Sequence, residues 1–404
     1  MQAEITESVQ GSIRAGELID TYYAGETNSK KQAYPAVCNT RFVQAFTNLG
    51  AGSSQFVISP NQGVSDIILQ LQMPTTMSGT NLSLPNGWGY GMISRVSVRY
   101  GSSAQYFWSG QQMMLENLID AENNPKVDSL VNLGGNYATG AACVGASALV
   151  YLKLPHNSCR ASGKPLPFPS DLLVQPIVIT VELLAPSSVF VSFGASVIPA
   201  TLGAAQLQAK QEILSDNSDL LARRVDMNQN AATFPLLYFA QQEVLVPANN
   251  GGAQTVNLTG FRAGEVKSIV LWLTLNTQTQ STVWYPMTSV TLTYNGEVFS
   301  RFDGASSQLW NIIQDSKSSA LNTSAVNTTT GAATPYVTQW IECQFAQVNL
   351  PSDRDSKLIH GKPILNAVVQ LSFTCPDSAN YTLHAMYLYN SSLLCSRGSA
   401  EYIF

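Results

Sequence analysis

The chain of 404 residues carries little charge. Asp, Glu, Lys and Arg together make up 12% of it, which is about half of the roughly 25% found in an average soluble domain. Hydrophobic residues make up 45% of the chain, so it can build packed interiors. Because an isolated protein of this length normally exposes more charge, the deficit predicts that neighbouring subunits cover much of its surface.

Positive charge is especially scarce. The net charge is −5 at pH 7, the sequence pI is about 5.3, and basic residues adjoin only at Lys30-Lys31 and Arg223-Arg224. Proteins that wrap nucleic acid tightly need many Lys and Arg side chains to neutralise the phosphates. The sequence therefore predicts no direct sequence-specific binding of nucleic acid.

Signals for secretion, membrane insertion and metal binding are also lacking. The first 25 residues contain acids and no apolar core, so the sequence predicts no signal peptide. It also has no run of 18 apolar residues, so it predicts no membrane-spanning helix. The cysteines form no CxxC pair and have no histidine at zinc-ligand spacing, so we expect buried free thiols, no metal and no cofactor. The six cysteines are Cys38, Cys143, Cys159, Cys343, Cys375 and Cys395.

Familiar catalytic motifs are missing too. The sequence contains no GxSxG, HExxH, GxxxxGK[ST] or GxGxxG motif and no EF-hand loop. Of the three histidines, His384 is expected at the solvent or at an interface, and His156 and His360 are expected in loops without a metal partner. These absences predict no enzymatic activity and no catalytic, cofactor-binding or metal-binding residues.

A carbohydrate-active site remains an alternative, because carboxylate pairs for glycoside hydrolysis meet only in the folded chain. The glycine-rich residues 87–91 precede an expected strand, so they predict a turn. Four tryptophans could stack on sugars, but we expect them in the core or in subunit contacts: Trp88, Trp108, Trp284 and Trp310. The candidate carboxylates are Asp66, Glu116, Asp120, Glu182, Glu265, Glu297 and Asp303.

The chain repeats itself. Residues 95–119 and 289–313 align without a gap at a spacing of 194 (289 minus 95), and six of the 25 aligned positions are identical. Both copies first alternate apolar and polar residues, which predicts a strand with one buried face, and then become helix-like. The identical pairs are Val96 and Val290, Tyr100 and Tyr294, Gly110 and Gly304, Leu115 and Leu309, Asn117 and Asn311, and Ile119 and Ile313.

Three further blocks recur in the same order. Their spacings are 202, 198 and 190 residues. Insertions of a few residues in loops produce differences of this size between the spacings. Collinear blocks indicate a tandem duplication of one unit. The blocks are 66–73 with 268–275, Gly163-Lys164-Pro165 with Gly361-Lys362-Pro363, and 177–183 with 367–373.

The sequence of each copy predicts about eight short strands, and these strands do not alternate with helices. This pattern is typical of all-β proteins, and it favours two tandem eight-stranded jelly-roll β-sandwiches with short helices in the connections. Residues 123–139 and 318–335 are predicted to be long loops. Leu and Ile residues at roughly helical spacing, from Leu207 to Leu221, predict a helical connector between the copies.

The predicted domains follow from these boundaries. Residues 1–33 are an N-terminal arm that is either disordered or docked on a neighbouring subunit or an underlying layer. The other domains are a first jelly roll at 34–200, the helical connector at 201–232, and a second jelly roll at 233–404.

The closing strands carry a resemblance to a known family. The motifs are Gly361-Lys-Pro-Ile-Leu-Asn366, Tyr381-Thr-Leu-His384 and Tyr387-Leu-Tyr-Asn390. Together with the duplicated roll and the low charge, they make the chain similar to the double jelly-roll major capsid proteins of icosahedral double-stranded DNA viruses. The resemblance is to those of polinton-like viruses, virophages and large algal DNA viruses, and in architecture it covers nearly the whole chain.

The resemblance implies a structural role in the virion. Members of this family form homotrimers whose six rolls make a pseudo-hexagonal capsomer, and the capsomers tile an icosahedral capsid. The implied partners are neighbouring capsomers, penton and minor capsid proteins, and possibly an internal membrane, with assembly inside the host cell. Two alternatives remain open: another trimeric virion or surface protein, such as a spike, and a carbohydrate-active β-sandwich enzyme or lectin.

Overall fold

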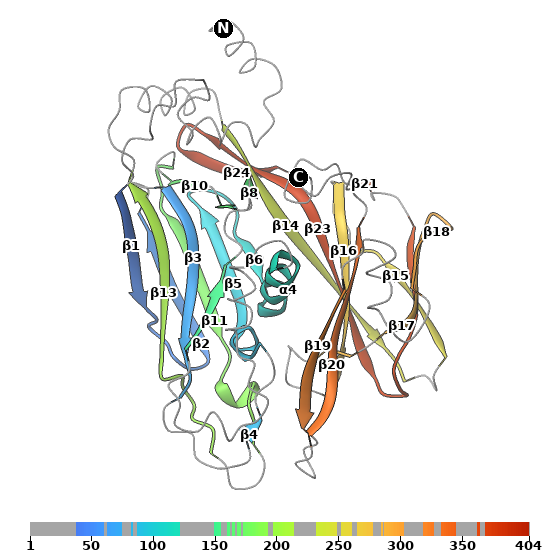
Figure 1. The fold of residues 1–404 in the computed structure, drawn as a ribbon. Coiled ribbons are helices and arrows are strands. Elements are labelled where there is room, and N and C mark those ends of the chain that lie inside the picture. The colour runs from blue at the N-terminus through green and yellow to red at the C-terminus, as the bar shows by residue number, and fades with distance from the viewer. Residues whose placement is uncertain are drawn as a thin grey trace, which may run out of the picture.

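The computed structural model describes a chain of strands arranged in two units (Figure 1). Nineteen stretches of the chain are described. They are residues 38–59, 63–74, 82–83, 87–121, 149–154, 160–161, 164–165, 168–170, 173–192, 197–213, 232–248, 252–260, 265–277, 284–285, 287–302, 318–326, 333–344, 362–363 and 368–403.

The first unit is a sandwich of two antiparallel sheets. One sheet contains β1 (Cys38–Ala45), β13 (Ala204–Ile213), β3 (Gly63–Gln72), β7 (Leu149–Lys153) and β10 (Phe168–Pro169). The other contains β2 (Gly52–Ile58), β11 (Ile177–Leu183), β5 (Ile93–Tyr100) and β6 (Tyr106–Trp108). The connections carry α3 (Trp88–Gly91), α4 (Gly110–Ala121), η3 (Pro186–Ser188) and the short pairs β4 (Leu82–Ser83) with β12 (Val191–Ser192) and β8 (Arg160–Ala161) with β9 (Lys164–Pro165).

The second unit is a sandwich of the same kind. Its larger sheet contains β14 (Ala232–Val246), β23 (Tyr381–Ser396), β16 (Glu265–Leu275), β20 (Ala333–Gln344), β19 (Ser318–Val326), β21 (Lys362–Pro363) and β24 (Ser399–Ile403). Its smaller sheet contains β15 (Ala253–Leu258), β22 (Val369–Thr374), β17 (Thr288–Tyr294) and β18 (Glu297–Phe302).

Strand order confirms the predicted duplication. The order β1-β13-β3-β7 in the first unit matches β14-β23-β16-β20 in the second, and β2-β11-β5-β6 matches β15-β22-β17-β18. The repeated sequence blocks fall on matching strands, with 66–73 on β3 and 268–275 on β16. Each unit is thus a jelly roll of two four-stranded sheets with additions, and the all-β double jelly roll expected from the sequence is confirmed.

The core of each roll follows from the two-residue period of its strands. In the first roll, Val96, Val98, Ile179 and Val181 are fully buried and pair across β5 and β11. In the second roll, Leu371 of β22 pairs with Leu292 of β17, and both are fully buried. Each aliphatic side chain removed from water in this way contributes about 1.5–3 kcal/mol, so the alternation in the sequence specifies which face packs inward.

The prediction of a helical connector at 201–232 is wrong for the part that the structure describes. Residues Ala204–Ile213 form β13, which pairs with β1 on one side and β3 on the other. Ala205, Leu207 and Ala209 are buried and alternate with Gln206 and Gln208. Ala, Gln and Leu favour helices as isolated residues, but pairing with two neighbouring strands overrides that preference.

Two predicted connections also differ from the structure. The expected loop at 318–335 contains β19 and the first three residues of β20, with which β19 forms an antiparallel pair. The expected turn at 87–91 contains the single helical turn α3, in which the Met92 N–H donates to the Trp88 carbonyl at 2.9 Å. The predicted helix after β6 is confirmed as α4. The arm at 1–33, the loop at 123–139, the helix-like end of 289–313 and the connector residues 214–231 lie outside the described residues.

Candidate functional site

The sheet of β14, β23 and β16 buries side chains on both of its faces along β23 and β16. One face carries Gln242, whose Oε1 accepts hydrogen bonds from the backbone N–H groups of Thr259 and Gly260, each at 2.8 Å, just beyond β15. This face therefore lies over the smaller sheet of the second roll. The opposite face carries Trp272 and Met386, which are also fully buried. A sheet with one wet face would expose these side chains, so the second face is covered at β23 and β16, while Glu243 and Leu245 on β14 are exposed.

A C-terminal hairpin carries the second roll onto the first. β23 and β24 are joined by a turn at Arg397 and Gly398, where φ is 50° and 77°. The Gly398 carbonyl accepts a hydrogen bond from the Val174 N–H at 2.9 Å, and the Ala400 N–H donates to Ser102 Oγ at 3.1 Å. In Figure 1 the hairpin crosses towards the first roll. These two bonds tie the end of the chain to the β5–β6 connection and to the segment before β11.

An aromatic cluster reinforces this contact. The ring centroid of Tyr402 in β24 lies 6.5 Å from that of Tyr100 and 5.8 Å from that of Tyr106, both in the first roll. Tyr106 in turn contacts Trp108 edge-on, with ring centroids 4.6 Å apart. Burial raises the pKa of Tyr100 well above its usual value, with a smaller contribution from Tyr402, so its hydroxyl remains neutral. Neutral aromatic rings in this arrangement stabilise the contact through buried area and edge-to-face geometry.

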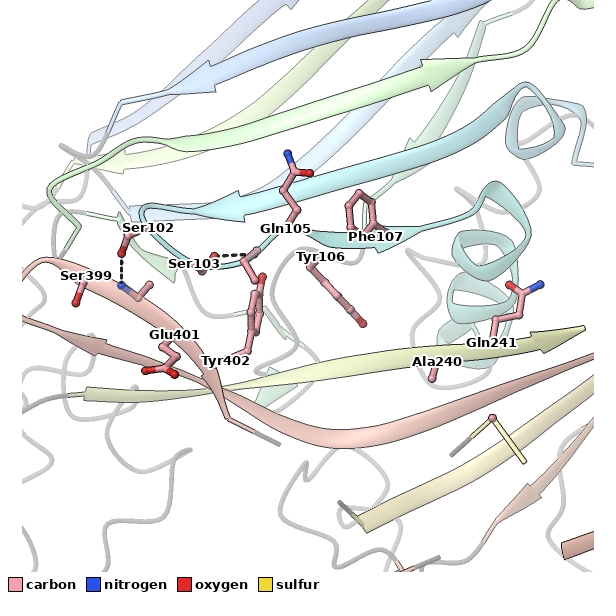
Figure 2. Close-up of a pocket in the computed structure, with 13 residues that line it drawn as sticks. Ser102, Ser103, Gln105, Tyr106, Phe107, Ala240, Gln241, Ser399, Glu401 and Tyr402 are labelled. Carbon is pink, nitrogen blue, oxygen red and sulfur yellow. Dashed lines mark hydrogen bonds between the residues drawn. The ribbon is translucent and has the colours of Figure 1, made fainter. Parts of the chain in front are cut away.

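A cleft of about 970 Å³ lies between the rolls (Figure 2). Its wall in the first roll is the β5–β6 connection together with β6, and its wall in the second roll is β14 and the C-terminal hairpin. The cleft lies beside the hairpin contacts, so it marks the seam along which the rolls meet. Its lining includes Ser102, Gln105, Tyr106, Gln241, Ser399 and Tyr402.

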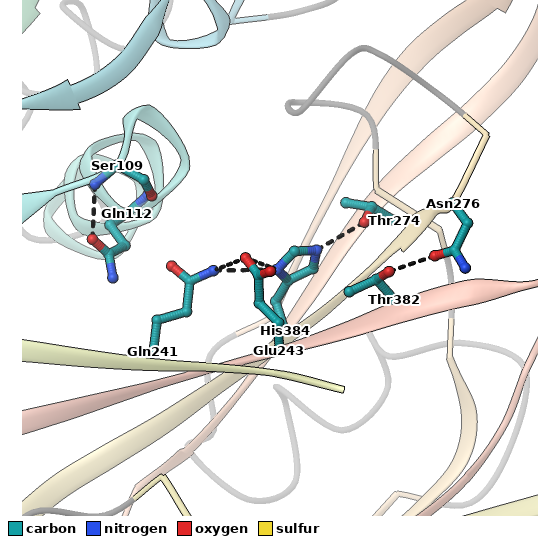
Figure 3. A network of polar contacts seen from close by, with 8 residues as sticks. All are labelled: Ser109, Gln112, Gln241, Glu243, Thr274, Asn276, Thr382 and His384. Carbon is teal, nitrogen blue, oxygen red and sulfur yellow. Dashed lines mark hydrogen bonds and ion pairs between the residues drawn. The ribbon is translucent and has the colours of Figure 1, made fainter. Parts of the chain in front are cut away.

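A polar network lies on the face of the larger sheet that carries Trp272 (Figure 3). His384 in β23 pairs with Glu243 on β14 and with Trp272 on β16. Its ring stacks on Trp272, with centroids 5.0 Å apart and an interplanar angle of 6°. Gln241 Nε2 lies 3.2 Å from Nδ1 of the ring, and Thr274 Oγ1 lies 2.8 Å from its Nε2.

This environment favours the neutral imidazole. Burial lowers the pKa of His384, while the Glu243 carboxylate, 3.3 Å from Nδ1, acts in the opposite direction. His384 lies on the face opposite Leu383 and Ala385, as predicted, but it is only 6% exposed. The expectation of a solvent residue is therefore wrong, because β23 is buried on both faces. In this setting the imidazole links three strands through polar contacts.

The other predicted residues do not meet in one place. Glu182 pairs with Arg95 in the first roll, while Glu297 is exposed on β18 in the second. The side chains of the other five carboxylates, together with His156, His360 and Trp310, lie outside what the structure describes. Trp88, Trp108 and Trp284 are buried, with 1% exposure or less, which confirms the expected core placement. In the described parts of the chain, no three His, Cys, Asp or Glu residues group as a metal site.

The sequence did not predict the seam between the rolls, although it carries one signal for the hairpin. Arg397 and Gly398 form a two-residue turn between Ser396 and Ser399, with Gly at the second turn position, which is typical of a β-hairpin. This turn signal favours a strand on each side of it, as β23 and β24 are. Within the described residues, no helix is long and apolar enough to span a membrane.

Comparison with known proteins rests on structure. No protein-family model matches the chain, and no curated protein matches it in sequence. A quasi-atomic model of the PBCV-1 virus capsid matches with a TM-score of 0.65 and 14% identity over 94% of this chain and 99% of that one. The Sputnik virophage structure, solved by cryo-EM, matches with a TM-score of 0.55 and 10% identity over 94% and 90%.

The mavirus major capsid protein is also similar. Its crystal structure matches with a TM-score of 0.51 and 10% identity, covering 95% of this chain and 94% of that one. Coverage is nearly complete on both sides in all three comparisons, so the likeness includes both rolls. The chain therefore has the double jelly-roll fold found in viral major capsid proteins.

Proposed function

We propose that this chain is a structural major capsid protein. Three copies form a pseudo-hexagonal capsomer of six rolls, and such capsomers tile an icosahedral shell. The observation that carries the proposal is the pair of rolls with the same strand order, joined through the C-terminal hairpin. The match of both rolls to the capsid proteins of PBCV-1 and mavirus supports it.

The physical argument is one of symmetry. Two equivalent modules in one chain let a closed three-fold ring present six similar lobes. A hexagonal outline is a shape that tiles a surface, whereas two unequal domains would not produce it. The low charge of 12% fits a subunit that partners cover on several sides.

In this proposal the protein acts in the virion and has no enzymatic role. Its partners are two further copies in the capsomer, neighbouring capsomers, and penton and minor capsid proteins, and an internal membrane is a further possible contact. Assembly takes place inside the host cell. The scarcity of Lys and Arg fits a shell that encloses a genome without a basic arm to bind it.

The test is the mass of the purified full chain in solution. Size-exclusion chromatography with light scattering should give a particle of about 131 kDa, which is three times 43.6 kDa. The particle should keep this mass on dilution across the micromolar range. A stable species of 43.6 kDa would contradict the proposal.

A further inference from the structure

The cleft between the rolls contains an unpaired strand edge. Within the described residues, β14 pairs with β23 and with no other strand. β14 also contains Pro235, and proline inside a sheet is confined to edge strands and bulges because its nitrogen carries no hydrogen. Every second residue of such a strand directs its N–H and C=O away from the neighbouring strand. These groups form a template on which a further strand can pair.

The cleft passes around this edge. Gln241 lies on one face of β14, where its Nε2 is 3.2 Å from His384 Nδ1. Gly260 lies over the opposite face, where its N–H donates to Gln242 Oε1 at 2.8 Å. Gln241 and Gly260 both line the cleft, together with Ala240 of β14. The cleft therefore reaches both faces of the sheet and the strand edge between them, at the position of Ala240 and Gln241 in Figure 2.

The wall in the first roll offers an aromatic side chain. Phe107 of β6 lines the cleft and is 42% exposed. Among the exposed large hydrophobic side chains of the described residues, Phe107 alone is aromatic. The Arg95 guanidinium carbon lies 5.1 Å from its ring centroid, which helps to fix the ring in place. A held aromatic ring at the side of a cleft is typical of the anchor positions in protein interfaces.

The charge of the cleft is negative. Glu401 is the one charged side chain among the described lining residues, and it is exposed. A second exposed carboxylate, Glu243, lies on β14 and accepts a hydrogen bond from the Gln241 amide at 2.9 Å. A ligand that carries a cation complements these carboxylates, whereas an anionic ligand is disfavoured.

The size of the cleft limits what can bind. Its volume of about 970 Å³ lies at the upper end of the roughly 300–1,000 Å³ that small-ligand sites occupy. This space admits one extended chain and excludes a folded domain. A free strand edge pairs with the main chain of a peptide, so the combination favours a peptide over a compact small molecule.

We infer that an extended segment of a second protein, about five residues long, binds the free edge of β14 as an added strand. An apolar side chain of the segment packs on Phe107, and a Lys or Arg lies near Glu401. Main-chain hydrogen bonds to β14 supply affinity, and the alternating side chains supply specificity. The cleft lies within one chain, so this inference does not depend on the trimer proposed above.

The first experiment selects ligands for the cleft. A phage-displayed library of random dodecapeptides is panned on the purified full chain, and the enriched peptides should combine Lys or Arg with a nearby apolar residue. A fluorescent copy of the most enriched peptide is then titrated by fluorescence anisotropy. We expect Phe107→Ser and Glu401→Lys each to weaken binding by about tenfold or more.

The matched control is Glu297→Lys. It makes the same change of charge at an exposed position of β18, away from the cleft, and should bind the peptide as the wild type does. Circular dichroism establishes that each variant is folded. A library without any binder, or a peptide that binds Phe107→Ser and Glu401→Lys as tightly as the wild type, would overturn the site.

The second experiment tests the main-chain pairing. Each nitrogen of the selected peptide is methylated in turn, and binding should be lost at every second position, because only alternate N–H groups of an added strand face β14. A matched loss at all positions, or at none, would contradict strand addition.

The third experiment asks whether the edge is free in the chain alone. In a strand with one partner, one of two consecutive N–H groups is bonded and the other points outward. Amide hydrogen exchange should therefore be slow at one of Ala240 and Gln241 and fast at the other, and the peptide should slow the fast one. Slow exchange at both without peptide would show that a segment of this protein already covers the edge, which would overturn binding by a second protein.

Discussion

The ring of Tyr402 lies 5.8 Å from the ring of Tyr106, although the residues are 296 positions apart (402 minus 106). The first belongs to the last strand of the second roll, and the second to a strand of the first. Together with the hydrogen bond from Ala400 N–H to Ser102 Oγ, this contact makes the end of the chain a clamp between the two rolls. A chain whose two modules are held in this way can act as one building block.

Removing the ring of Tyr402 should loosen the clamp. Tyr402→Ala deletes its contacts with Tyr100 and Tyr106, and we expect a loss of about 3 kcal/mol in the free energy of unfolding. Amide hydrogen exchange in β24 should become faster. Tyr402→Phe keeps the ring and serves as the matched control. Wild-type exchange in β24 of the alanine variant would show that the cluster does not hold the hairpin.

Position 398 in the turn of the hairpin should not tolerate a side chain. Gly398 has φ of 77°, and a Cβ there would lie 2.2 Å from Val174 Cγ2. Gly101 has φ of 56°, but its added Cβ would meet Leu173 Cδ2 at an ordinary 3.4 Å. Both alanine variants pay about 1–2 kcal/mol for the left-handed backbone. Chemical denaturation should therefore show a larger loss for Gly398→Ala, and equal losses would contradict the close contact with Val174.

Stability should depend on the protonation of His384. Its folded-state pKa is lowered by burial, so the unfolded chain takes up a proton first as the pH falls below about 7. The free energy of unfolding should fall from there until the pH passes the folded-state pKa. Glu243 and Gln241 from β14 and Thr274 from β16 face the ring.

The variant His384→Gln removes this titration. Denaturation at a series of pH values should give a shallower slope for the variant than for the wild type between about pH 7 and pH 5. Identical slopes would mean that His384 binds its proton equally well in both states. The Glu243 carboxylate would then offset the effect of burial on the pKa.

The thiol of Cys395 should report opening of the hairpin. Burial raises its pKa to about 12, and burial with the nearby Asp377 raises that of Cys375 to about 11. At pH 8 the reactive thiolate of Cys395 is therefore about one part in ten thousand. Iodoacetamide should label Cys395 slowly in the wild type and faster in Tyr402→Ala. Rapid labelling of Cys395 in the folded wild type would contradict its burial.

The sequence predicted those features in which one strand face is apolar. The alternation at 177–183 and 367–373 predicted β11 and β22, because each buries one side in its own roll. The repeats predicted the duplication, because matching strands of the two rolls face matching cores. The turn at Arg397 and Gly398 could predict the hairpin but not where it docks, since the seam joins residues about 300 positions apart.

The failures have two physical causes. β13 was predicted as a helix because Ala and Gln carry strong helix preferences, while its strand pairing with β1 and β3 is visible only in the folded protein. His384 was expected at the solvent or at an interface because alternation assumes one face outside the core of the roll. β23 has no wet face at this point, since His384 and Met386 on its second face are at most 6% exposed.

The measurement that tests the central claim most directly is electron cryo-microscopy of the purified particle. Class averages should show three-fold symmetry and six lobes of similar size, each accommodating one jelly roll. In a map, two adjacent lobes should be bridged by the extended β14, β23 and β24 of one chain. A particle with two lobes, or a trimer whose outline is not hexagonal, would contradict the capsomer.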